Sequence, residues 1–165
     1  MKVLVALMVL LGQWVLEAAE VVPQPFPAAS FDSLHIELTE NGTTTSVDLD
    51  NGSVVYEVTS ADGKVVEKVT TQPDDDAWFQ FIQKLNEAKV YKWAPRYYYP
   101  GQGAKWGIAL KIDNQGFMSV GHNEYPKEGA EGDPAADPQG GKTLPFRLFW
   151  QAVLVLAGKA KVSGA

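Results

Sequence analysis

Three turn dipeptides at nearly equal spacing constrain the fold of this chain more than any other feature. Asn41-Gly42, Asn51-Gly52 and Asp62-Gly63 each join two short segments in which apolar and polar residues alternate. Asn-Gly and Asp-Gly suit the positive backbone dihedrals of two-residue type I′ turns, and alternation is the period of a half-buried strand. Residues 34–69 are therefore predicted to form a four-stranded antiparallel meander.

Each turn also predicts which residues of the two joined strands lie opposite each other. The predicted pairs on the apolar face are Ile36 with Val47, Tyr56 with Val47, Tyr56 with Val69, and Ser60 with Val65. The other, solvated face is predicted to pair His35 with Asp48 and to align Glu37, Ser46, Glu57 and Lys68. Glu67 opposite Val58 is the one predicted pair that sets a charged residue against an apolar one. At the other positions the turns and the alternation agree on a single register.

Two helices are predicted, one after the meander and one near the end of the chain. The first begins with N-cap candidates at residues 74–76, and its apolar stripe consists of Trp78, Phe81, Ile82 and Leu85. The second begins at Thr143, and its apolar side consists of Phe146, Phe149, Trp150, Val153 and Ala157. Because Leu148, Ala152 and Val155 make its other side apolar too, this helix is expected to be largely buried or to dock a partner.

Further strands are predicted between the helices. Residues 90–93 are a short strand candidate, and residues 105–112 alternate clearly. The turn at residues 113–116 is predicted to carry a glycine bulge, which pairs Ile112 with Met118 and Leu110 with Val120. A simple two-residue loop would instead set Leu110 against Ser119, so the bulge is preferred because it keeps apolar residues opposite one another.

Together these elements predict an α+β fold. We expect an antiparallel sheet of about six to seven strands, made of the meander and a C-terminal hairpin, with two helices on one face. The 165 residues suffice for one core. A single domain is predicted over residues 31–158, followed by a tail at residues 159–165.

The N-terminal segment has the pattern of an export signal. A basic start at Lys2, an apolar run over residues 3–16 and small residues at Ala18 and Ala19 predict a signal peptide over residues 1–18. The alternatives are an uncleaved anchor and a buried apolar helix. Residues 19–30, which contain three prolines, are predicted to be an extended lead-in. The expected location is periplasmic or secreted, with membrane contact only transiently through the signal peptide.

Composition excludes several classes of function. The chain has no cysteine, which excludes thiol catalysis, disulfides and thiolate metal sites. Its formal net charge of -6 argues against nonspecific binding to nucleic acid. Gly101-x-Gly103 is too short for a phosphate loop and precedes a strand. No cofactor is predicted.

Spaced aromatic residues and one short motif run through the second part of the chain. They are Trp78-x-x-Phe81, Trp93, Trp106 and Gly121-x-Asn123-x-Tyr125-Pro126. Over roughly residues 50–158 this pattern resembles an uncharacterised secreted bacterial domain. That domain has no established activity, so the resemblance assigns no catalytic residue. The chain departs from the pattern by a long Gly-, Pro- and Asp-rich insertion after Pro126.

The candidate ligand site comes from the aromatic residues at 91–106. Tyrosine gives a large rigid contact area with a polar tip, which suits sugars, peptides and protein partners. In an extended segment Tyr98 points away from Tyr97 and Tyr99, so at least one phenol should reach solvent. The alternative is that these tyrosines pack beneath the loop at residues 100–101, with Trp93 and Trp106 in the core.

Acid-base chemistry has little support. Neither His35 nor His122 lies in a triad or in metal-ligand spacing. His122 is predicted to point to the helix-covered face, in a structural role. The candidate ligand-binding residues are Arg96, Tyr97, Tyr98, Tyr99, His122 and Asn123, with no catalytic or metal-binding residue. The sequence thus favours a non-enzymatic binding module for an unknown protein, peptide or glycan; the alternative is a small hydrolase of the cell envelope that uses carboxylates near His122.

Overall fold

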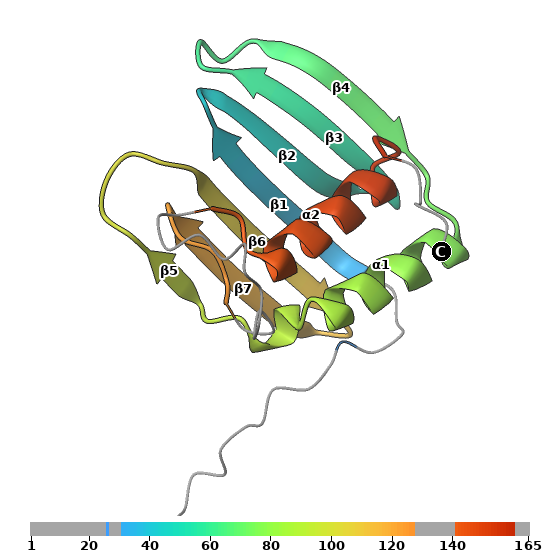
Figure 1. Ribbon diagram of the computed structural model, residues 1–165. Coiled ribbons are helices and arrows are strands. Elements are labelled where there is room, and N and C mark those ends of the chain that lie inside the picture. The colour runs from blue at the N-terminus through green and yellow to red at the C-terminus, as the bar shows by residue number, and fades with distance from the viewer. Residues whose placement is uncertain (1–25, 27–30, 128–140, 161–165) are drawn as a thin grey trace, which may run out of the picture.

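A single seven-stranded sheet carries both helices on one of its faces (Figure 1). The computed structural model describes residues 26, 31–127 and 141–160. The strand order is β4-β3-β2-β1-β6-β7-β5. The elements, in chain order, are β1 (Phe31–Glu40), β2 (Thr43–Asp50), β3 (Ser53–Ser60), β4 (Val65–Thr71), α1 (Asp75–Glu87), the 3-10 turn η1 (Val90–Lys92), β5 (Arg96–Tyr98), β6 (Lys105–Ile112), β7 (Gln115–His122) and α2 (Leu144–Leu156). The predicted α+β class, meander and pair of helices are confirmed.

The meander has the predicted register through its first two turns. Asn41 and Asn51 have positive φ angles of 50° and 49°, as type I′ turns require. Val47 lies opposite both Ile36 and Tyr56, and Tyr56 lies opposite Val69. Because paired residues point to the same face, apolar side chains from four strands meet beneath the helices.

The third turn differs from its prediction by one residue. The β3–β4 register shifts after Val58, so Val65 lies opposite Thr59, and the predicted pair of Ser60 with Val65 is wrong. The N–H of Gly63 donates to the carbonyl of Ser60 at 2.8 Å, and the N–H of Ser60 donates to the carbonyl of Lys64 at 2.9 Å. These hydrogen bonds close a loop that is one residue longer than the predicted two-residue turn. Within this loop only Gly63 takes a positive φ.

The hairpin of β6 and β7 also corrects a prediction. Asp113 and Asn114 both have positive φ, and they form a tight two-residue turn with no glycine bulge. Leu110 therefore lies opposite Phe117, and neither the predicted pair with Val120 nor the alternative with Ser119 occurs. Asn and Asp tolerate the left-handed region well enough to replace Gly in such a turn.

The changed register reverses the two faces of β7. Gly121 lies opposite the buried Trp106, on the helix-covered face, and Ser119 is buried there with its hydroxyl donating to the carbonyl of Ala94 at 2.7 Å. Met118 and His122 therefore face the open side of the sheet, because side chains alternate along a strand. The prediction that His122 points to the helix-covered face is wrong.

The segment between α1 and β6 also differs from its prediction. Residues 90–93 are predicted as a strand, but residues 90–92 form the η1 turn instead. Lys89 takes a positive φ of 52° there, and the N–H of Lys92 donates to the carbonyl of Lys89 at 2.8 Å. The strand lies further on, at β5, and it pairs in parallel with β7. β5 is last in the strand order and so forms one edge of the sheet.

The helices begin and pack as predicted. The carboxylate of Asp74 accepts a hydrogen bond from the N–H of Ala77 at 2.8 Å, which caps α1. Three side chains of α1 are buried, namely Phe81, Ile82 and Leu85, and α2 buries Phe146, Phe149 and Val153 among others. Trp93 and Trp106 are core residues. Within the described residues, no helix has the length and apolar character needed to cross a membrane.

One residue of the predicted lead-in, Phe26, is hydrogen-bonded to helix α1. The N–H of Phe26 donates to Oδ1 of Asn86 at 2.8 Å, and Nδ2 of Asn86 donates to the carbonyl of Phe26 at 3.0 Å. The Phe26 ring packs edge-on against Phe117, with centroids 5.7 Å apart. The predicted signal peptide and the rest of the lead-in lie outside the described residues, as do residues 161–165 of the tail and most of the insertion.

Candidate functional site

The open face of the sheet carries polar side-chain pairs over the meander. Nδ1 of His35 and Oδ1 of Asp48 are hydrogen-bonded at 2.6 Å, and Lys68 contacts Glu57 at 2.9 Å. Ser46 lies opposite both Glu37 and Glu57, as predicted. These contacts are solvated, and such pairs contribute little to stability. This part of the face is thus an ordinary water-facing surface.

A shallow hollow lies where β1, β6 and β7 run side by side on the same face. Its volume is about 280 Å³. The floor contains the small residues Gly107 and Ala109 of β6, which leave space that larger side chains would fill. His35 and Glu37 line it from β1, and Met118 and Val120 line it from β7. The hollow therefore has one polar wall and one apolar wall.

Exposed apolar side chains continue from this hollow to the sheet edge. Met118 is 67% exposed, Val120 is 37% exposed and Tyr98 of β5 is 61% exposed. Tyr98 lies opposite His122 in the parallel pair of β5 and β7, and their rings meet edge to face with centroids 5.4 Å apart. We call Tyr98, Met118, Val120 and the hollow the open-face patch.

Arg96, Tyr98 and His122 are the predicted ligand residues that share this face. Arg96 lies opposite Val120 and is exposed. Tyr99 follows the end of β5 and is 48% exposed, with its N–H donating to the carbonyl of His122 at 3.0 Å. At least one phenol therefore does reach solvent, as the alternation in the segment indicated.

Tyr97 and Asn123 have structural surroundings instead. The Tyr97 hydroxyl accepts a hydrogen bond from the N–H of Ala94 at 2.7 Å, and its ring packs 5.7 Å from that of Trp106. The N–H of Asn123 donates to the carbonyl of Ala104 at 2.7 Å. Its side chain lies so close to Gly103 that a Cβ there would be 2.1 Å from Oδ1. Asn123 thus holds the loop before β6 against the end of β7, and Tyr97 joins the segment before β5 to the core.

Met118 and Val120 were missed by the sequence reasoning. The bulge register pairs them with core residues of β6 and so turns both toward the helices. The signal that could have found them is the Asp113-Asn114 dipeptide, read as a two-residue turn. That reading leaves Met118 and Val120 as large apolar residues on a solvent-facing strand surface.

The titratable groups near His122 are engaged in structural contacts. Glu124 accepts a hydrogen bond from the N–H of Tyr98 at 3.0 Å and forms an ion pair with Lys127 at 3.3 Å. Burial, followed by the charge of Glu40, raises the pKa of the Tyr125 phenol to about 12. In the part of the chain that the structure describes, no group of three or more His, Asp or Glu side chains is placed to hold a metal ion.

No protein-family model matches this chain, and a search of curated proteins finds no match.

Proposed function

We propose that this chain is an exported, non-enzymatic binding module whose contact surface is the open-face patch. The observation that carries the proposal is the group of Tyr98, Met118 and Val120, all exposed on the open face of the adjacent strands β5 and β7 beside a hollow. Large apolar side chains that gather on a surface mark sites of interaction. Export is proposed from the signal pattern of residues 1–18, with a periplasmic or secreted location.

The chemistry of the patch favours a protein or peptide partner. Met118 is flexible and polarisable, so it can adapt to an apolar side chain, and Tyr98 adds a rigid surface with a polar tip. Because Gly107 has no side chain, the sheet backbone itself forms part of the floor of the hollow. His35, Glu37 and Lys105 supply polar groups at its rim. An apolar anchor in the hollow, surrounded by polar contacts, is the usual anatomy of an interface.

A panel-binding experiment tests this proposal. The purified chain is screened against a displayed peptide library and against envelope polysaccharides. We expect it to select peptides with an apolar or aromatic anchor. The double variant Tyr98→Ala, Met118→Ala should bind them about tenfold or more weakly, because it removes two exposed anchor side chains. Its melting temperature should stay within a few degrees, since neither residue is in the core.

The matched control is Glu57→Ala, Lys68→Ala, which removes one ion pair from the same face over the meander. It should keep full affinity. Equal loss in both double variants would refute the patch as the binding surface, as would unchanged binding by the Tyr98, Met118 variant. Selection of polysaccharides alone would refute the protein or peptide class.

A further inference from the structure

Glu37 differs from every other acidic residue of strands β1 to β4 and their turns. Its carboxylate has no hydrogen bond or ion pair with any of the described residues, and the side chain is only partly exposed. The other acidic residues of this region all have a partner, and they are Asp32, Glu40, Asp48, Asp50, Glu57, Asp62 and Glu67. Partial burial of an unpaired charge is unfavourable, so a cation that contacts Glu37 would be stabilised.

The register of the sheet places this carboxylate at the hollow of the open-face patch. Glu37 lies opposite Gly107 of β6, which in turn lies opposite Val120 of β7. Neighbouring strands are about 4.8 Å apart, so the backbones of Glu37 and Val120 are about 10 Å apart. Both residues line the hollow. A carboxylate and an apolar surface therefore face each other across a glycine, with no side chain between them.

From this arrangement we infer that the peptide bound by the open-face patch carries a basic side chain next to its apolar anchor. The inference rests on the proposed function and names the class of its partner. The anchor contacts Met118 and Val120, and the stem of the basic side chain lies over Gly107 with its charged head at Glu37. Arginine and lysine both suit such a path, because their stems pack on apolar surface while their heads reach a charge. Arginine suits it better, since its planar donors match a carboxylate.

The other charged residues of the hollow leave Glu37 open to a partner. His35 is hydrogen-bonded to Asp48 at 2.6 Å. Lys105 is exposed and lies opposite Thr39, which makes it a diagonal neighbour of Glu37, and the two side chains form no ion pair. Lys105 is thus a solvated competitor for the carboxylate, and such a contact contributes little.

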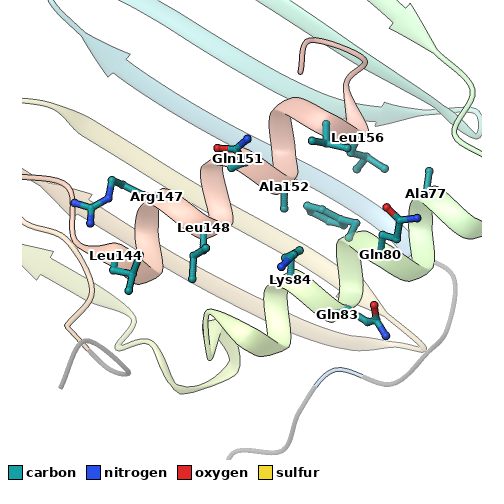
Figure 2. A pocket seen from close by; sticks show the side chains of 12 residues that line it. Ala77, Gln80, Gln83, Lys84, Leu144, Arg147, Leu148, Gln151, Ala152 and Leu156 are labelled. Atoms are coloured by element: carbon teal, nitrogen blue, oxygen red, sulfur yellow. The ribbon is translucent and has the colours of Figure 1, made fainter. Parts of the chain in front are cut away.

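The groove between the helices is unsuited to the same basic side chain. It lies between α1 and α2, on the other side of the sheet, and has a volume of about 510 Å³ (Figure 2). Figure 2 shows Leu148 extending from α2 toward α1, with Gln80 and Lys84 on the facing side. Among the described residues that line this groove, the charged ones are Lys84 and Arg147, and none is acidic. A basic side chain would meet like charges there.

A synthetic peptide array tests the inference. Its short capped peptides have a central leucine, varied flanking residues and, at one flanking position, arginine, its neutral analogue citrulline, or glutamate. We expect the chain to bind the arginine peptides about fivefold or more tightly than the matched citrulline peptides, and the glutamate peptides least. Glu37→Gln should abolish the preference for arginine and leave the binding of citrulline peptides unchanged, because it removes the charge and keeps the size. Its melting temperature should stay within a few degrees, since no partner is lost.

Two control variants separate this site from the overall charge of the chain. Glu87→Gln removes the same charge from an exposed position on α1, on the other side of the sheet, and should keep the preference for arginine. Lys105→Gln removes the competing cation and should bind the arginine peptides at least as tightly as the original chain. Loss of the preference in Glu87→Gln would reduce it to a general charge effect and overturn the inference. Tightest binding of the glutamate peptides, lost in Lys105→Gln, would assign the hollow to an acidic partner instead.

The same array distinguishes failure of this inference from failure of the proposed function. Equal binding of arginine and citrulline peptides, abolished by Tyr98→Ala, Met118→Ala, would overturn the basic side chain and keep the patch as the contact surface. A preference for arginine that Glu37→Gln abolishes, with affinity unchanged in the Tyr98, Met118 variant, would keep the basic side chain and refute the apolar part of the patch. Binding to none of the peptides would overturn both.

Discussion

Val47→Asp is expected to lower the free energy of unfolding by about 4 kcal/mol or more, enough to unfold a marginally stable domain. Val47 has no exposed surface, and it lies between Ile36 and Tyr56 at the centre of the meander's covered face. A carboxylate there would be desolvated without a partner. Urea denaturation followed by circular dichroism measures the change.

The neighbouring residue provides the matched control. Asp48 lies on the open face, where its partner is the exposed His35. Asp48→Ala should therefore change stability by less than about 1 kcal/mol. If Asp48→Ala proved the more damaging of the two, the meander would be shifted by one residue, and every side chain in it would be on the wrong face.

Gly121→Ala is expected to cost about 3 kcal/mol or more, through steric conflict rather than burial of charge. A Cβ at Gly121 would lie 2.1 Å from Nε1 and Cε2 of Trp106. That ring cannot easily move, since Trp106 is buried, and its Nε1 donates to the carbonyl of Glu124 at 2.8 Å. The Phe146 ring, with its centroid 5.2 Å away, also contacts it.

Gly116→Ala on the same strand is the control for this substitution. A Cβ there would meet no atom within 4 Å. Its stability should change by about 0.5 kcal/mol or less, as for other surface positions. Thermal melts of the two variants provide the comparison. Equal melting temperatures for Gly121→Ala and the original chain would contradict the packing of Trp106 against β7.

The meander could be predicted because its signals are local. Asn41-Gly42 and Asn51-Gly52 specify their turns within two residues, and the alternating strands on either side agree with them. The same local reasoning failed at Asp113-Asn114, because glycine at position 116 suggested a bulge while two residues that tolerate positive φ closed the turn earlier. Competing turn chemistries of similar energy are not separated by periodicity alone.

The candidate sites were only partly predictable for the same reason. The exposure of Tyr98 follows from alternation within its own segment, so it could be inferred from sequence. Met118 and Val120 lie on the open face because of the register between β6 and β7, which the sequence pattern did not predict. The parallel pairing that sets Tyr98 beside His122 joins residues far apart in the chain, and no local pattern specifies it. The apolar second side of α2 predicted a helix that is largely buried or docks a partner, and the structure leaves Leu148 and Val155 on that side partly exposed.

Hydroxyl-radical footprinting tests the central claim, that the open-face patch is the contact surface, most directly. The chain is oxidised alone and in complex with the tightest peptide from the binding panel, and side-chain oxidation is quantified by mass spectrometry. We expect the oxidation of Met118 and Tyr98 to fall severalfold in the complex, while that of Phe79, an exposed residue on α1, stays the same. Protection of Phe79 or of the groove between the helices, with Met118 oxidised as fast as in the free chain, would contradict the claim.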